Sequence, residues 1–318
     1  MKIFGKALMA AVVVASSASA QQAMDAQKAQ RCATRLSIAI TGKSATSTLL
    51  ADSNPQLSVD QLLSSTDFQD RFARFANATF NADREPGAVP AEDAPYYLAK
   101  YVLQNNKPWS QLFLGQYNVD VAAGEAADST NVVVKTDANG LGYFRSMPWM
   151  LRFAGNELAG IKISTGYRMM NNTIGLQLVA STNAPNADVS QTGRHAAGCT
   201  ACHFDGWFAL DHVASVLSRK VTTTSNGNTT ISFGPPPETP QQVFGGITVA
   251  DDKDVVTALV NSTAFQFRSC RLAFMYLYGR PEQTCEGPVF DKCMDAFGQT
   301  GKITDALKTV ATDPSYCQ

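Results

Sequence analysis

The sequence predicts a mainly α-helical protein with two small β-hairpins in its middle third. Apolar residues recur at helical spacing in the N-terminal and C-terminal parts of the chain. The pairs Asn139-Gly140 and Asn226-Gly227, which are typical of tight hairpin turns, both lie in the middle. At 318 residues the chain is long enough for one large domain or two ordinary domains with real hydrophobic cores.

Residues 1–20 have the pattern of a cleavable export signal. A start with two lysines precedes an apolar run over residues 7–15, and small residues up to Ala20 form a cleavage site. We therefore expect a mature chain that begins at Gln21 and is periplasmic or secreted.

Charge and hydropathy restrict the partners of this mature chain. Without Lys2 and Lys6 it carries 24 basic and 27 acidic residues, a formal net charge of −3. Such a balance argues against nucleic acid as a partner. No later segment approaches the roughly 18 consecutive apolar residues of a membrane span, so we expect a soluble exported protein.

The N-terminal region, 21–130, is predicted to be helical. A first helix runs from Gln21 to about Lys43, with Gly42 as its stop signal. A second begins near Thr66, where Gln69 three residues later completes a capping-box pattern. Three phenylalanines and a threonine recur there at helical spacing, Phe68, Phe72, Phe75 and Thr79, and we interpret the aromatic stripe as core and not as a cofactor wall. After a Pro-rich linker at 86–95, a third helix is expected over 94–105.

The middle region, 131–233, contains both predicted hairpins. Each would pair two strands around an Asn-Gly turn, residues 131–134 with 141–144 and residues 221–224 with 229–233. The segment 234–240 that follows contains four prolines and cannot be helix or central strand. We take it as a linker and as the best domain boundary.

The C-terminal region, 241–318, returns to helices. Four are predicted: Asp252–Asn261, Ser262–Tyr278, Pro288–Phe297 and Ile303–Thr312. The phrase at 262–268, STAFQFR, repeats the STDFQDR phrase at 65–71. We interpret the pair as a common helical design and not as a solenoid, because two copies are too few for one.

Seven cysteines are present, and five of them lie outside the motif described next. In an oxidising compartment the four C-terminal cysteines are expected to pair, and three connectivities are possible. We favour Cys270 with Cys285 and Cys293 with Cys317, which leaves Cys32 free and staples the C-terminal region.

Cys199-Thr-Ala-Cys202-His203 is the stretch that dictates a chemistry. C-x-x-C-H is the pattern for covalent attachment of a c-type haem, in which two thiols add to the porphyrin vinyl groups and the imidazole ligates the iron. We therefore expect one covalent haem c on Cys199 and Cys202, with His203 as the proximal ligand. All three histidines of the chain lie between Arg194 and Val213, which favours a metal.

Two readings of the same residues without haem remain. A redox-active Cys199–Cys202 pair would belong in a strand-to-helix, thioredoxin-like setting, whereas the residues before Cys199 have a loop composition. A zinc site would need further ligands from the histidines, and His212, ten positions after Cys202, does not fit the usual finger spacing.

The second axial ligand of a haem would decide its function. We rank His195 first, because the four residues from His195 to Cys199 span at most about 14 Å when extended, which reaches the far face. A methionine ranks second, with Met169 and Met170 ahead of Met147 and Met150. His212 ranks third and an open site last. Asp211 and Arg194 are interpreted as propionate-binding or surface groups.

The residues around the motif resemble a known family. Asp205, Gly206 and the phrase Phe208-Ala-Leu-Asp211 after His203 are similar to the haem phrase of the cytochrome-c-like domains of unknown function in large secreted planctomycete and myxobacterial proteins. The C-terminal region resembles that family's C-terminal module at 259–265, Cys270 and 278–280. The resemblance implies a helical cytochrome-c-like architecture and a haem protein, without a named reaction.

Three function classes follow from these observations. The first is an exported, soluble mono-haem cytochrome that transfers single electrons to and from redox partner proteins, with no catalytic residues. The second is a peroxidase- or oxygenase-type enzyme with an open distal site. The third is a structural module in which the haem only staples the fold. We favour the electron carrier, because so few histidines leave no obvious distal acid or base.

Overall fold

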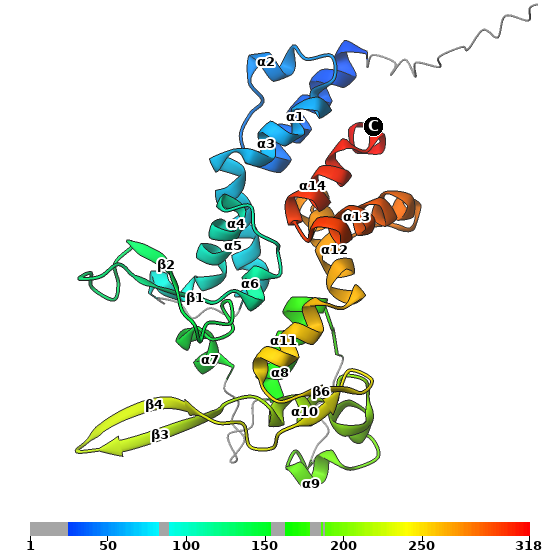
Figure 1. Cartoon of the computed structure of the whole chain (residues 1–318). Helices are drawn as coiled ribbons and strands as arrows, with labels where there is room; N and C mark the ends of the chain where they lie inside the picture. The colour runs from blue at the N-terminus through cyan, green and yellow to red at the C-terminus, as the bar shows by residue number, and fades with distance from the viewer. Residues whose placement is uncertain (1–24, 83–88, 154–162, 179–185, 187) are drawn as a thin grey trace, which may run out of the picture.

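The computed structural model describes residues 25–82, 89–153, 163–178, 186 and 188–318 (Figure 1). The described part is mainly helical, with three two-stranded antiparallel sheets. This confirms the mainly α part of the predicted fold class. The predicted export signal at 1–20 lies outside the described residues, as does the start of the first predicted helix. Among the helices that are described, none has the length and hydropathy needed to cross a membrane.

The N-terminal helices are α1 (Ala26–Thr41), α2 (Ser47–Leu50), α3 (Val59–Ser64), α4 (Thr66–Phe80), α5 (Ala94–Gln104) and α6 (Gln111–Leu114), with 3₁₀ turns η1 (Pro55–Ser58) and η2 (Pro90–Glu92). Three of these helices, α1, α4 and α5, form where the sequence predicts them, and the shorter elements were not predicted individually. Helix α1 ends at Gly42, whose φ of +75° lies in the left-handed region that favours glycine.

The cap of α4 is one residue earlier than predicted. Ser65 has extended backbone angles, and its hydroxyl oxygen accepts a hydrogen bond from the Phe68 N–H at 3.2 Å, whereas Thr66 is already helical. Ser262 and Phe265 make the same contact at the start of α12 (3.3 Å). The repeated seven-residue phrase therefore encodes the same serine cap twice.

The aromatic face of α4 is core, as predicted. Phe68 and Phe72 are fully buried, and their rings pack against Tyr276 of the C-terminal region. Phe72 also meets Trp109 edge to face. The stripe therefore joins the two ends of the chain in one aromatic cluster.

The first predicted hairpin is wrong in its partner strand. Strand β2 (Val132–Thr136) pairs with β1 (Tyr117–Val121) and not with residues 141–144. The turn at 137–140 does form, with Gly140 N–H donating to Asp137 O. Beyond it, Leu141, Tyr143 and Phe144 are all buried, so these residues fill the core instead of alternating as a strand with one solvent face would.

The middle of the chain then builds a set of short elements. They are α7 (Met147–Arg152), α8 (Ile163–Ile174), α9 (Gln191–Arg194), a π-helical turn η3 (Ala201–Asp205), α10 (Leu210–Ser215), and strands β3 (Arg219–Ser225), β4 (Asn228–Gly234), β5 (Gln241–Val243) and β6 (Ile247–Val249). The predicted second hairpin is confirmed as β3 and β4, with Asn226 and Gly227 both at positive φ. The small β5–β6 hairpin after the Pro-rich segment was not predicted.

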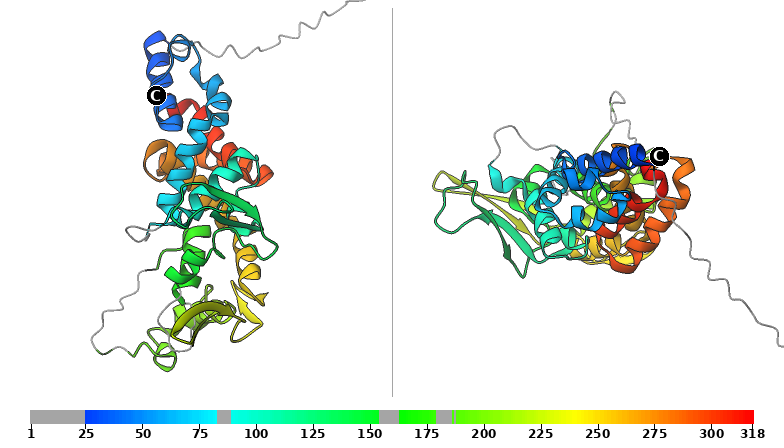
Figure 2. Two further views of the ribbon diagram at one scale, coloured as in Figure 1. Left: turned by 90° about the vertical axis from the view of Figure 1, so that its left-hand side faces the viewer. Right: turned by 90° about the horizontal axis from the view of Figure 1, so that it is seen from above.

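The four C-terminal helices are confirmed. They are α11 (Asp252–Val260), α12 (Thr263–Tyr278), α13 (Gly287–Thr300) and α14 (Ile303–Thr312), with 3₁₀ turns η4 (Thr284–Glu286) and η5 (Pro314–Cys317). Helices α1 and α14 lie at the same end of the elongated molecule, and α8, α10 and the strands β3–β6 lie at the other (Figure 2).

Two hydrophobic cores correspond to these two ends. The larger core contains side chains from the N-terminal and the C-terminal helices together, among them Leu36, Phe113, Phe274 and Leu307. The smaller core lies among α8, α10, α11 and the β5–β6 hairpin, and contains Met170, Val213, Val243, Val249 and Leu259. Because α8 and α11 contribute to both, they connect the C-x-x-C-H end of the molecule to the larger core.

The disulfides differ from the predicted connectivity. Cys32 pairs with Cys317, and Cys270 pairs with Cys293, while Cys285 is an exposed free thiol. The helical hairpin of α12 and α13 brings Cys270 and Cys293 together in the core, whereas Cys285 lies in the η4 turn outside it. Cys32, which was expected to be free, forms the disulfide that joins α1 to the last turn, η5.

The Cys32–Cys317 bond should be a major source of stability. It closes a loop of 285 residues, so the double variant Cys32→Ala/Cys317→Ala should lower the free energy of unfolding in urea by about 3 to 5 kcal/mol. Cys285→Ala is the matched control and should change it by less than about 0.5 kcal/mol. Peptide mapping without reduction should recover the 32–317 and 270–293 pairs; a 270–285 pair would contradict the structure.

Candidate functional site

The C-x-x-C-H motif forms one exposed turn between α9 and α10. The N–H groups of Cys202 and His203 both donate to the carbonyl of Cys199, at 3.1 and 3.2 Å. The hydroxyl of Thr200 donates to the Asp205 carboxylate at 2.8 Å and ties the two ends of the turn together. Cys199 is half-buried, Cys202 is exposed, and both are free thiols. The predicted haem-binding residues therefore lie together on one turn and are accessible.

A buried carboxylate orients the imidazole of His203. Asp211 Oδ2 lies 2.6 Å from His203 Nδ1, and the Asp211 side chain is only 6% exposed. Because a carboxylate only accepts hydrogen bonds, Nδ1 carries the proton in this contact. In the neutral imidazole the other ring nitrogen, Nε2, then keeps a free lone pair, which is the form of histidine that ligates a metal.

Arg194 completes the group by pairing with the same carboxylate. Its Nη2 lies 2.7 Å and its Nε 3.0 Å from Asp211 Oδ1, and its Nη1 donates to the carbonyl of Val189 at 2.8 Å. Arg194 is itself buried. The resulting chain Arg194–Asp211–His203 connects the end of α9, the first turn of α10 and the C-x-x-C-H motif.

Local sequence explains why α10 presents Asp211 at this position. Ala209 has a left-handed backbone with φ of +34°, which turns the chain sharply before α10 begins at Leu210. Val213 on the opposite side of α10 is fully buried, and Gly166 of α8 leaves space for it, since an added Cβ would lie 3.0 Å from Val213 Cγ1. The smaller core therefore fixes the helix that carries Asp211.

The three histidines gather around one aromatic ring, that of Phe204. His195 stacks on it face to face, with ring centroids 3.6 Å apart and an interplanar angle of 10°. His212 meets it edge to face at 5.8 Å, and His203 lies at 6.4 Å. Within the described residues, however, no group of three or more His, Cys, Asp or Glu is arranged to hold a metal ion.

The lower-ranked ligand candidates have other contacts in the structure. His212 Nδ1 lies 2.6 Å from the amide oxygen of Gln241 on β5. Met169 is buried in the larger core and Met170 in the smaller one, so both pack as core side chains. Met147 is 45% exposed.

The sequence did not indicate that Asp211 orients the His203 ring or that Arg194 pairs with Asp211. The surface alternative for Asp211 and Arg194 is wrong, because both side chains are buried and paired with each other. The available signal was the spacing, since an acid eight residues after the histidine lies in the first turn of the next helix. Phe204 was missed as well, because nothing local indicates that its ring contacts the imidazoles of His195 and His212.

Comparison of the chain with family models, curated proteins and solved structures found no match in any of the three. The resemblance of the haem phrase to the planctomycete and myxobacterial domains therefore stays a prediction.

Asp211 should be essential for the stability of this part of the molecule. Asp211→Asn leaves the buried Arg194 guanidinium without a counter-charge, so the free energy of unfolding in urea should fall by about 3 kcal/mol. The matched control is Asp60→Asn, which removes the partner of Lys308 in an exposed pair and should cost less than about 1 kcal/mol. Equal effects of the two variants would show that the Arg194–Asp211–His203 group carries no special energy.

Proposed function

We propose that this chain is an exported c-type haem protein with one covalent haem on Cys199 and Cys202 and with His203 as an iron ligand. The observation that carries the proposal is the 2.6 Å contact of His203 Nδ1 with the buried Asp211, beside two free thiols on the same turn. These residues supply the donor set that haem c requires, namely two accessible thiols and one imidazole with a free Nε2.

Each residue of the group has a separate task in this proposal. The thiols of Cys199 and Cys202 form the two thioether links. Asp211 keeps the proton on Nδ1 and fixes the ring orientation, which also makes Nε2 a stronger donor. Arg194 balances the charge of Asp211 in a site that excludes most water. When bound, the haem would supply a one-electron Fe(III)/Fe(II) couple.

We propose electron transfer as the function, with redox proteins as the partners. The support is the position of His195, whose imidazole is held against Phe204 directly after the fixed Arg194. If His195 also held the iron, the haem would exchange electrons without an open position for peroxide or oxygen. A peroxidase-type enzyme with an open site is the alternative, and the spectroscopic experiment below separates the two.

Export to the periplasm or the exterior is part of the same proposal. The N-terminal pattern of residues 1–20 supports it, and the two disulfides among the described residues support it independently, because disulfides persist in oxidising compartments. Haem c is attached on that side of the bacterial membrane. Localisation and cofactor are therefore consistent with each other.

Haem attachment should require both motif cysteines. Wild-type protein coexpressed with a cytochrome c maturation system should retain haem on a denaturing gel, at one haem per chain by the pyridine haemochrome assay. Cys199→Ala/Cys202→Ala should lose this signal, whereas Cys285→Ala, which removes the remaining free thiol, should retain it. One bound zinc per chain with no haem stain would end the proposal.

The EPR and optical spectra of the ferric protein should show which residues ligate the haem iron. His195→Ala should convert low-spin iron to high-spin iron, because an imidazole leaves the coordination sphere. His212→Ala is the control, since that ring is bound to Gln241, and it should leave the spin state unchanged. A wild-type protein that is already high-spin and turns over peroxide rapidly would replace the carrier with the enzyme.

A further inference from the structure

A concave site lies on a different part of the chain from the C-x-x-C-H motif. It is an open cavity of about 540 Å³, a size that suits a small-molecule ligand. Helices α5 and α6, the β1–β2 hairpin and α11 contribute its lining residues, which are Tyr101, Lys107, Gln111, Leu114, Gln116, Tyr117, Thr136, Lys253 and Thr257. None of these residues takes part in the Arg194–Asp211–His203 group.

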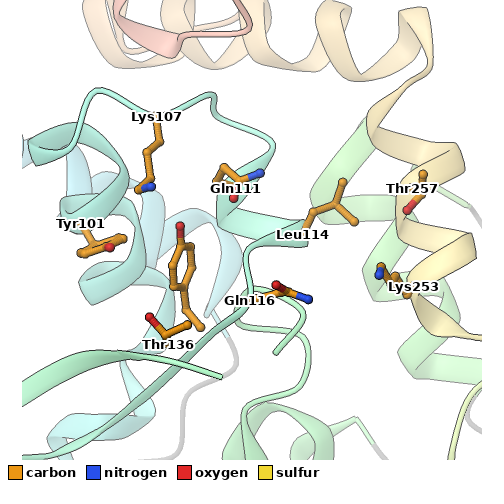
Figure 3. Close-up of a pocket in the computed structure, with 9 residues that line it drawn as sticks. Tyr101, Lys107, Gln111, Leu114, Gln116, Thr136, Lys253 and Thr257 are labelled. Carbon is orange, nitrogen blue, oxygen red and sulfur yellow. The ribbon is translucent and has the colours of Figure 1, made fainter. Parts of the chain in front are cut away.

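The charge of this cavity is positive, although the whole chain is weakly negative. Lys107 and Lys253 lie on opposite sides of it, with Gln111, Leu114 and Gln116 between them (Figure 3). Among the described residues that line it, none is acidic, and neither lysine forms an ion pair with a described carboxylate. No carboxylate of the described residues therefore neutralises either ammonium group by direct pairing.

The acidic residues beside Lys253 in the sequence are already engaged. Asp252 binds the guanidinium of Arg145, with Nε 3.0 Å from Oδ2. Asp254 accepts a hydrogen bond from the Ala250 N–H at 2.9 Å. Because these carboxylates have partners of their own, they do not neutralise the cavity by direct pairing.

Two tyrosines form an aromatic wall beside Lys107. Their rings, Tyr101 and Tyr117, meet edge to face at 5.0 Å, and the Lys107 ammonium lies 5.8 Å from the centre of each. A hydrogen bond with Tyr117 raises the pKa of Lys107, which keeps the ammonium charged. Glycine is required behind this wall, since an added Cβ at Gly115 would lie 2.2 Å from Tyr117 Cε2. The Tyr117 ring therefore packs directly against the backbone at Gly115.

The remaining lining is rich in groups that bind hydroxyls. Gln111 and Gln116 offer amides, and Thr136 and Thr257 offer hydroxyls. A simple aromatic acid would use the tyrosines and one lysine but would leave these four side chains without a ligand partner. A sugar ring presents an apolar C–H face to an aromatic side chain and hydroxyls around its edge, so it matches both kinds of lining.

We propose that this cavity binds an acidic sugar of one or two units, with uronic acid carboxylates paired to Lys107 and Lys253 and a ring packed on the Tyr101–Tyr117 wall. The two lysines on opposite sides favour a ligand with two carboxylates over one with a single charge. The inference is independent of the proposed haem.

The test is calorimetric titration of the full mature protein with three probes: digalacturonate, its neutral counterpart galactobiose, and benzoate. Digalacturonate should bind, and its affinity should fall as salt rises from 20 to 300 mM, because exposed charge pairs are screened. Lys107→Met and Lys253→Met should each weaken it at least fivefold, and Tyr101→Leu should do the same. Lys220→Met, an exposed lysine on β3, is the matched control and should bind like wild type.

Each contrary outcome overturns a stated part of the proposal. If galactobiose bound as tightly as digalacturonate, the carboxylates would have no role in binding. If benzoate bound as tightly, the site would not be specific for a sugar. Loss of affinity in Lys220→Met would indicate diffuse charge attraction and not a site. Absence of binding by all three probes, with the circular dichroism melt of the protein intact, would overturn the proposal as a whole.

Discussion

The candidate site depends on the contacts that the buried Asp211 carboxylate makes with Arg194 and His203. Alone this carboxylate would be costly to bury, but the guanidinium of Arg194 and the imidazole of His203 approach it from two sides. Removal of water makes both contacts stronger than they would be at the surface. One charged group therefore fixes the position of α9, α10 and the C-x-x-C-H motif relative to one another.

This arrangement is possible because the smaller core holds α10 from behind. Leu210 and Val213 of α10 pack among residues of α8, α11 and the β5–β6 hairpin, so Asp211 lies between an apolar layer and the motif. The larger core, with both disulfides, lies at the other end of the molecule. Most of the buried apolar side chains therefore lie away from the motif, where Cys202 is exposed.

Short-range sequence patterns predicted most of the helices. Helix α14 has the predicted bounds, α1 ends at the predicted glycine, and the β3–β4 hairpin turns at the predicted Asn-Gly pair. Each depends on residues that are near one another in the chain, such as a cap, a turn or one apolar face. Predictions of which distant residues pair were wrong: β2 pairs with β1, and Cys32 pairs with Cys317. Such pairs depend on how elements that are far apart in the chain pack together.

The same division applies to the candidate site. The sequence by itself determined the chemistry of the motif, because two thiols and an imidazole in C-x-x-C-H are next to one another whatever the fold. Tertiary structure alone decided that Asp211 binds His203, that Arg194 binds Asp211 and that the Phe204 ring contacts His195 and His212. It also brought Lys107 and Lys253 to opposite sides of one cavity. Such contacts join residues from different elements, and their geometry exists only once the cores have packed.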